Sequence, residues 1–336
     1  MTHLEVLLKA YPVGLPTLED FEIAQAETPE LQPGEILVRT EYLSMDPFPR
    51  MRMNAASRVG PSMRLGEAVE GRGAGYVVES RSGDLDVGEA VVGEFGWREF
   101  AVVNAGDVAT VDRALGGLDL HLSGLGASGL TAYFLHRSVR DDVGGRTYVI
   151  APAAGSVGAV LGQLAIRDGA RAIGVCDGPL QIDFLKRLGF ADVIERAAPD
   201  LGDEARRACP DGWDVFQDGV GGPLHDAMTP TMNAAARIMV FGFISGYGDT
   251  FPKRYGDVGA MLMKRAELKG FLLADFAQDV DAARQDLAKM ISEGQLKVVR
   301  HVSEGLENAP AAFISLFQSS PPGKQLVRVH QSGDFS

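Results

Sequence analysis

The stretch Arg146-Thr-Tyr-Val-Ile-Ala-Pro-Ala-Ala-Gly-Ser-Val-Gly-Ala-Val-Leu-Gly-Gln-Leu-Ala165 decides the fold of this chain. Residues 147–151 form a short run of mostly β-forming side chains, and the glycine pair before them marks a turn. Small residues follow at Ala153, Gly155 and Gly158, and apolar residues then recur at helical spacing. The pattern predicts a strand, a tight turn and a helix.

The spacing of these small residues matches a dinucleotide-binding fingerprint whose first glycine has become alanine. Small side chains let such a turn close, and they let backbone N–H groups approach a pyrophosphate at the positive end of the following helix. Turns of small residues between a strand and a helix also occur in α/β proteins for packing alone. The stretch by itself therefore leaves both interpretations open.

The length and composition indicate a two-domain protein of a reducing compartment. The chain has 336 residues, of which 46% are hydrophobic, and no segment is long and apolar enough for us to expect a membrane span. Its two cysteines, Cys176 and Cys209, argue against a disulfide framework, and the N-terminus lacks a secretory signal, so we expect a cytoplasmic protein. A net charge of −13 argues against nucleic acid and anionic membranes as partners.

Short strands separated by Gly and Pro turns dominate the N-terminal third. We expect strands at 35–42, 75–80, 90–95 and 97–103, which together predict a small β barrel or sandwich. Between the first two lies a proline-broken loop, residues 43–53, that carries bulky side chains. Such a loop either lines a site on the scaffold or crosses the surface.

Strand and helix patterns alternate from residue 120 onward. The expected strands, besides 147–151, are 172–176, 192–194, 214–218, 236–242 and 267–273, and the expected helices include 181–188, 224–233 and 280–293. This alternation predicts a parallel, doubly wound sheet with its ligand at the carboxyl ends of the strands. A last helix near 309–316 and a strand at 325–329 predict that the tail returns to the first domain. We therefore expect one domain of residues 1–119 and 298–336 and another of residues 120–297.

A series of short motifs runs in one order along the chain: Tyr42-Leu-Ser-Met-Asp-Pro-Phe, Gly93-Glu-Phe-Gly-Trp, Leu125-Gly-Ala-Ser-Gly-Leu-Thr-Ala-Tyr, Ala153-Ala-Gly-Ser-Val-Gly, Asp218-Gly-Val-Gly-Gly, Ala236-Arg-Ile, Gly242-Phe-Ile-Ser-Gly-Tyr, Gly270-Phe, Gly305-Leu-Glu-Asn-Ala-Pro and Gly323-Lys. In these motifs the chain resembles the zinc-independent medium-chain dehydrogenase/reductases, and within them the alkenal/one oxidoreductases, such as leukotriene B4 dehydrogenase, the prostaglandin reductases and the plant double-bond reductases. The resemblance implies an α/β protein with a GroES-like β-barrel catalytic domain and a Rossmann domain, expected as a homodimer.

The same resemblance assigns residues to the cofactor. The pyrophosphate would lie on Gly155, Ser156, Val157 and Gly158. The residues that flank the nicotinamide would be Phe241, Gly242, Phe243, Ile244, Ser245 and Tyr247, and Gly219, where the family usually has an asparagine, would also lie at the cofactor. The backbone of Phe271, Leu272 and Leu273 would meet the carboxamide.

The expected coenzyme depends on three residues near the adenosine. Gln181 stands where the family usually has a lysine for the 2′-phosphate, and Arg196 stands where it usually has a tyrosine. Asp177 lies 19 residues beyond Gly158, close to where an acidic residue binds the ribose 2′-hydroxyl of NAD. An unpaired carboxylate would repel a phosphate, whereas the arginine would attract one. The family pattern favours NADP(H), and NAD(H) stays possible.

The reaction implied is reduction of a C=C bond conjugated to the carbonyl of an enone or enal, with hydride transferred to the β carbon. Tyr247 is the candidate donor to the carbonyl oxygen, where negative charge develops. The alternative is that Tyr247 only hydrogen-bonds the cofactor ribose. Phe48, Arg50 and Met51 are the candidate substrate contacts, with packing as the alternative role of Phe48.

Other activities are weighed against this interpretation. Zinc is not expected, because there is no cysteine before Cys176 and the histidines lack ligand spacing. His225 is expected to be a surface or helix residue. A quinone oxidoreductase of the same superfamily is the nearest alternative, and an alcohol dehydrogenase is disfavoured without zinc. A non-catalytic nucleotide-binding protein also stays open, because Gly219 and Pro321 replace two asparagines that the family usually carries.

Overall fold

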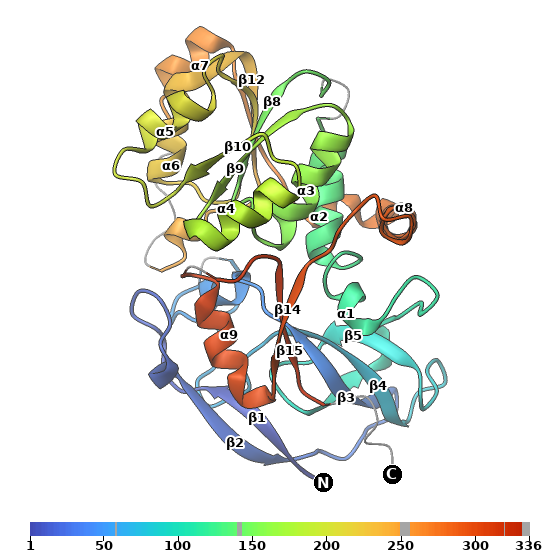
Figure 1. The fold of residues 1–336 in the computed structure, drawn as a ribbon. Coiled ribbons are helices and arrows are strands. Elements are labelled where there is room, and N and C mark those ends of the chain that lie inside the picture. Colours follow the sequence, from blue (N-terminus) through green and yellow to red (C-terminus); the bar gives the residue numbers. More distant parts are fainter. Residues whose placement is uncertain (58, 140–142, 249–255, 319, 331–336) are drawn as a thin grey trace. The chain divides into compact units, whose positions relative to one another are not determined.

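The computed structural model describes residues 1–57, 59–139, 143–248, 256–318 and 320–330. Its internal contacts divide the chain into two compact units. The first comprises Met1–Ser123, Arg300–Ser320 and Lys324–Ser336, and the second comprises Gly124–Val299 and Pro321–Gly323. The ribbon in Figure 1 is coloured along the sequence. None of the helices formed by the described residues has the length and apolar character needed to span a membrane.

The first unit is built on β-strands. β1 (Thr2–Leu8) and β2 (Phe21–Glu27) pair antiparallel as a two-stranded ribbon. Seven further strands form a sheet: β3 (Glu35–Ser44), β4 (Arg72–Ser80), β5 (Ala90–Glu94), β6 (Phe100–Asn104), β7 (Ala109–Thr110), β14 (Arg300–Glu304) and β15 (Lys324–Arg328). Their order is β14–β15–β3–β4–β5–β7, with β6 also paired to β3, and only the β14–β15 pair is parallel.

Short helices and an aromatic cluster complete the first unit. The helices are η1 (Leu18–Asp20), η2 (Phe48–Met51), η3 (Ala105–Asp107), α1 (Leu118–His121), η8 (Leu306–Asn308) and α9 (Ala309–Ser315). Phe21 stacks on Trp97 with ring centroids 5.6 Å apart, and Phe313 of α9 meets Trp97 edge-on at 5.4 Å. The C-terminal helix α9 therefore contributes to the core around the first strands, which share a buried apolar cluster with it.

The second unit contains six parallel strands. They are β8 (Thr147–Ala151), β9 (Arg171–Cys176), β10 (Asp192–Glu195), β11 (Trp213–Asp218), β12 (Met232–Val240) and β13 (Glu267–Gly270), in the order β10–β9–β8–β11–β12–β13. The predicted parallel, doubly wound sheet is confirmed. The chain reverses its direction of winding between β8 and β11, and ligands of such sheets bind at the carboxyl ends beside that switch point.

Helices cover this sheet. They are α2 (Ala127–Arg137), α3 (Ser156–Arg167), α4 (Gly178–Arg187), α5 (Leu201–Ala208), α6 (Pro223–Met228), η5 (Thr229–Thr231), η6 (Ile244–Gly246), α7 (Val258–Lys264), η7 (Leu273–Asp279) and α8 (Val280–Ser292). In Figure 1, α5, α6 and α7 lie on one side of the sheet, and α2 and α3 lie on the other. The helix expected at 224–233 is α-helical only to Met228, because Pro230 lacks an N–H; a 3-10 turn continues to Thr231, and β12 begins at Met232.

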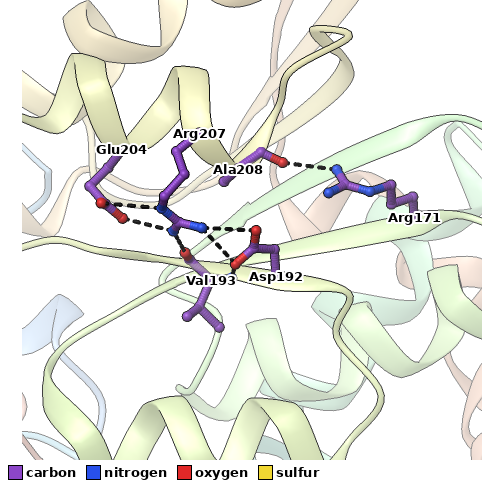
Figure 2. A network of polar contacts seen from close by, with 6 residues as sticks. All are labelled: Arg171, Asp192, Val193, Glu204, Arg207 and Ala208. Atoms are coloured by element: carbon purple, nitrogen blue, oxygen red, sulfur yellow. Dashed lines mark hydrogen bonds and ion pairs between the residues drawn. The ribbon is translucent and has the colours of Figure 1, made fainter.

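Helix α5 was not expected, because its sequence is short and polar and buries only Ala205 and Ala208. It is held to β10 largely by Arg207, as Figure 2 shows. The Arg207 guanidinium donates to both carboxylate oxygens of Asp192 at 3.0 and 2.9 Å and to Glu204 at 2.8 Å. Arg171 of β9 donates to the Ala208 carbonyl at 2.9 Å and ties down the end of the helix. Polar contacts thus hold α5 in place of the apolar stripe by which a helix is usually predicted from a sequence.

Both cysteines are expected to be unreactive in the folded protein. Cys176 and Cys209 are free thiols, each only 2% exposed. Burial raises the pKa of Cys176 to about 12 and that of Cys209 to about 11. The reactive thiolate is therefore scarce at pH 8, whereas an unfolded thiol ionises near a pKa of about 8.5. The two buried neutral thiols therefore contribute to the stability of the folded state below a pH of about 8.5, and this contribution is lost as the pH rises toward 11–12.

A disulfide reagent at pH 8 measures this expectation. Native protein should show fewer than one reactive thiol over the time in which the unfolded chain shows two. Rapid stoichiometric reaction of the native protein would contradict the burial of these two side chains.

Candidate functional site

The turn between β8 and α3 is where the sequence predicts that the cofactor pyrophosphate binds. Gly155 precedes α3 in an extended conformation and has no side chain that could cap the helix. The first N–H groups of the twelve-residue helix therefore point toward the turn without a capping side chain at Gly155. A Cβ at Gly158 would lie 2.1 Å from the Pro152 carbonyl oxygen, so helix and turn can approach this closely only with glycine there. A Cβ at Gly155 would meet nothing closer than 3.8 Å. Gly158 therefore serves packing, while the protein itself does not require Gly155 to be glycine.

A second segment lies along this turn. Gly323 donates its N–H to the Ala154 carbonyl at 2.8 Å and forms a parallel bridge with Gly155. A Cβ at Gly323 would lie 2.4 Å from the Val299 carbonyl oxygen, and its φ is +96°. Pro321, which replaces an asparagine expected from the family, belongs to the same segment of the second unit. Residues 321–323 thus border the turn with backbone groups.

Asp177 and Arg196 form an ion pair at the adenosine end of the predicted site. Asp177 follows β9 and Arg196 follows the neighbouring strand β10, so the parallel sheet brings their side chains together. Arg196 donates through Nε and Nη2 to the carboxylate, with distances of 2.7–3.2 Å. Gln181 is buried, and its Oε1 accepts the Asp177 N–H at 2.9 Å. The carboxylate is therefore balanced by an arginine rather than unpaired.

The turns after β11 and β12 pack on each other. Gly219 donates to the Ala151 carbonyl at 2.7 Å and so joins the ends of β8 and β11. A Cβ at Gly219 would lie 2.7 Å from the Phe241 ring, which gives a steric reason why no asparagine stands there. Ser245 donates its N–H at 3.2 Å and its hydroxyl at 2.6 Å to the Val220 carbonyl. The segment 241–247 is thereby fixed to the turn that follows β11.

Tyr247 follows η6 at the end of this segment. Its ring meets Phe243 edge-on with centroids 5.1 Å apart, and its side chain is half-buried. Burial raises the pKa of the Tyr247 hydroxyl, and a hydrogen bond with the Phe243 backbone partly opposes that rise. The hydroxyl is therefore protonated at neutral pH, which is the state a proton donor needs.

Residues 271–273 follow β13 at the same edge of the sheet. Phe271 donates its N–H to the Val240 carbonyl at 2.9 Å, and its ring stacks on Phe276 with centroids 5.4 Å apart. Leu272 is 68% exposed, and Leu273 opens η7. Because all six strands are parallel, every predicted cofactor residue lies at or just beyond their carboxyl ends or in the first turn of a following helix.

The three predicted substrate residues lie in η2 of the first unit and differ in exposure. Phe48 is 50% exposed, whereas Met51 and Arg50 are buried. The Arg50 guanidinium donates to the carbonyls of Pro12 and Gly14 and to the side chain of Asn54. Arg50 thus holds neighbouring backbone in place, and Phe48 is the member of the three whose ring is open to solvent.

The sequence did not point to a buried pair beneath the turn after β11. His225 lies in helix α6, one of its two expected places, but it is 2% exposed, and its Nδ1 lies 3.2 Å from a carboxylate oxygen of Asp218. The other Asp218 oxygen accepts N–H groups from Val220 and Gly221, both at 2.8 Å. The motif Asp218-Gly-Val-Gly-Gly carried a signal for it, since an aspartate ahead of a glycine turn often accepts such bonds. Within the described ranges, no group of three or more His, Cys, Asp and Glu side chains is arranged to hold a metal ion.

Comparisons with known proteins agree with this architecture. Residues 5–111 match a family model described as the N-terminal domain of oxidoreductase, and residues 156–292 match one described as zinc-binding dehydrogenase. The chain is 31% identical to the NADPH-dependent curcumin reductase of Escherichia coli K12 over 330 residues, with 96% of each chain covered. It is 34% identical to prostaglandin reductase 1 of Bos taurus over 327 residues, covering 96% of this chain and 97% of the other.

A solved structure is similar over the whole chain. It is that of CurA from Vibrio vulnificus in complex with NADPH, which is 31% identical and superposes with a TM-score of 0.90. The match covers 98% of this chain and all of the other. Both family models, the full-length relatives and the sheet order point the same way: the chain belongs to the zinc-independent medium-chain dehydrogenase/reductase family of oxidoreductases, in the branch that includes the curcumin and prostaglandin reductases.

Proposed function

We propose that this protein uses NADPH to reduce the C=C bond of α,β-unsaturated aldehydes or ketones. The observation that carries the proposal is the shared sheet edge, where the turn at Gly155 follows β8 and the Tyr247 segment follows β12 of the same parallel sheet. A nucleotide seat and a protonated hydroxyl are the two parts that such a reduction needs. The names of both relatives support a reductase, and that of the NADPH-dependent curcumin reductase supports NADPH as the coenzyme.

The residues of the chain would divide the work as follows. NADPH, when bound, supplies the hydride that reaches the β carbon. The backbone N–H groups at residues 155–158 bind its pyrophosphate, and the backbone of residues 271–273 orients the carboxamide. The Tyr247 hydroxyl donates a hydrogen bond to the substrate carbonyl oxygen as negative charge builds there, and a proton from that hydroxyl or from water then reaches the α carbon to give the saturated carbonyl. Phe48 contacts the apolar part of the substrate.

An acceptor panel tests the function directly. Purified protein would be mixed with NADPH and, in separate reactions, with an enone, an enal or a quinone. A further reaction would contain NADP⁺ and a secondary alcohol. Nicotinamide absorbance is followed in each. We expect oxidation of NADPH with the enone and the enal, and a saturated carbonyl product. Turnover with the quinone alone would replace the proposal by a quinone oxidoreductase, and no turnover with any partner would favour a non-catalytic nucleotide-binding protein.

The ion pair of Asp177 and Arg196 should set the choice of coenzyme. Replacing Arg196 with leucine should raise the KM for NADPH roughly ten- to a hundredfold, since a hydrogen bond to a charged group is worth about 1.5–3 kcal/mol. The effect on NADH should be small, because the released carboxylate can accept a hydrogen bond from a ribose hydroxyl. Steady-state kinetics with both coenzymes measure the ratio.

A matched control for Arg196 is available in the same unit. Arg206 of α5 is exposed and paired with Asp203, so Arg206→Leu should leave both KM values unchanged. Equal changes for NADPH and NADH in the Arg196 variant would contradict a role in recognising the 2′-phosphate.

We also infer the division of labour, the assembly and the location. Residues 1–119 and 298–336 would form the catalytic domain, and residues 120–297 the dinucleotide-binding domain.

A homodimer is supported by exposed apolar side chains on α7 and the edge strand β13: Val258 (76%), Leu262 (74%), Met263 (76%) and Leu268 (41%). Light scattering should give twice the monomer mass of 35.8 kDa, and a monomer at micromolar concentration would contradict it. Two free thiols fit a cytoplasmic protein.

A further inference from the structure

Lys324 is a buried lysine whose ammonium group is bound within the first unit. It is 2% exposed and opens β15, which pairs antiparallel with β3. Its Nζ donates to the Met45 carbonyl at 2.8 Å and to a carboxylate oxygen of Asp46. Met45 and Asp46 are the first residues after β3 ends at Ser44. The lysine therefore binds the beginning of the loop that carries Phe48.

Asp46 remains charged in this environment. Burial by itself would raise the pKa of its carboxyl, but the charge and hydrogen bond of Lys324, a hydrogen bond from Ser44 and the charge of Arg72 together lower that pKa below its ordinary value. The Ser44 hydroxyl donates to Asp46 Oδ2 at 2.5 Å. The carboxylate is therefore ionised at neutral pH, and Lys324 faces a full negative charge.

The loop from Met45 to Met51 is fixed at both ends. At its start stand Lys324 and Ser44, as described, and near its end the Arg50 guanidinium donates to the Pro12 and Gly14 carbonyls. Prolines at 47 and 49 remove backbone freedom between these points. Phe48, between the two anchors, is the large apolar side chain that the loop leaves 50% exposed.

Lys324 is buried, whereas the Asp46 side chain is 35% exposed, and an ion pair of this kind contributes little to stability by itself. What a charged, hydrogen-bonded pair adds is a defined position for the backbone on either side. We propose that Lys324 is a positioning residue that, through Asp46, fixes the loop so that the Phe48 ring contacts the enone substrate. This role rests on the proposed reductase function and concerns the substrate rather than the coenzyme.

The choice of variant separates the substrate role from the coenzyme role. Gly323, next to Lys324, donates to Ala154 in the turn before α3, so a change at 324 risks disturbing nucleotide binding as well. Asp46→Asn avoids this, because it keeps the volume and an acceptor oxygen but removes the charge. Ser44→Ala removes one hydrogen bond to Asp46 while leaving the ion pair intact, and it serves if Asp46→Asn folds poorly.

The matched control is Arg328→Gln on the same strand. Arg328 pairs with Glu304 and donates to the Tyr42 hydroxyl at 3.0 Å, so its loss also removes an ion pair from β15. Neither of these two partners belongs to residues 45–51. A general loss of stability should therefore affect the control and Asp46→Asn alike.

The experiment measures KM and kcat for a small and a bulky enone and the Kd for NADPH. Asp46→Asn should raise the KM for the bulky enone about tenfold, change kcat less than threefold and leave the NADPH Kd within twofold. Ser44→Ala should raise the same KM about two- to threefold, and Arg328→Gln should not raise it. Wild-type KM in both Asp46→Asn and Ser44→Ala, or a parallel rise of KM and NADPH Kd, would overturn the positioning role alone. Failure of the wild type to reduce any enone would overturn the proposed function and this role with it.

Discussion

Replacement of Tyr247 by phenylalanine is expected to lower kcat for enone reduction about a hundredfold or more, the usual cost of losing one donor to a developing oxyanion. The phenyl ring keeps the edge-on packing against Phe243, so the segment 241–247 should stay in place. The Kd for NADPH should change less than threefold. Stopped-flow absorbance of the bound nicotinamide separates the hydride step from product release.

The pH profile provides a second measurement of the Tyr247 role. Burial raises the pKa of this hydroxyl above its ordinary value near 10, so the donor form is present throughout the range from pH 6 to 9. The loss in Tyr247→Phe should therefore be the same at each pH in that range. A deficit that appeared only at one end would point to another titrating group.

A second tyrosine of the same unit provides the control for Tyr247→Phe. Tyr148 lies fully buried in β8, and its hydroxyl donates a long hydrogen bond of 3.4 Å to the Val139 carbonyl, outside the predicted site, so Tyr148→Phe should leave kcat within twofold. If Tyr247→Phe keeps wild-type kcat but binds NADPH more weakly, the tyrosine positions the cofactor and donates no proton.

The central strand, turn and helix could be predicted from the sequence because their signals are local. The strand at 147–151 has the predicted ends, since the β-forming residues stop at Pro152 and α3 begins at Ser156 after a turn of small residues. Helix α5 could not be predicted in this way, because Arg207 and its carboxylate partners hold it in place of an apolar stripe. Local patterns report burial, and they say little about an element held by charges.

The site contacts that could not be predicted from the sequence join residues that lie far apart in the chain. The sequence could not show whether the Asp177 carboxylate is paired, because its ion pair with Arg196 depends on β9 and β10 being neighbours in the sheet. The contact of Lys324 with Asp46 joins residues from opposite ends of the chain, and no spacing rule connects them. Arg50 resembled a substrate contact by its place in a loop, whereas its burial follows from carbonyls at Pro12 and Gly14 that only the folded chain brings near.

Gly155, which precedes α3, and Gly158, in the first turn of that helix, should respond in opposite ways to alanine. Gly158→Ala places a Cβ 2.1 Å from the Pro152 carbonyl oxygen, so the helix must move away from the turn. Overpacking of this kind usually costs about 1–3 kcal/mol, and contact with backbone puts this case at the upper end or beyond. We expect a Tm several degrees below wild type, measured by differential scanning calorimetry.

Gly155→Ala should instead fold normally and bind NADPH poorly. Its φ of −75° suits alanine, and the new methyl group would meet only Pro152, at 3.8 Å. The same methyl would occupy the approach of a pyrophosphate to the helix N-terminus, so the NADPH Kd should rise tenfold or more, which corresponds to about 1.4 kcal/mol or more. Gly144→Ala is the control, because nothing lies within 4 Å of a Cβ there. If Gly155→Ala binds NADPH like wild type, the small residues of this turn serve packing alone, and the nucleotide must bind elsewhere on the sheet edge.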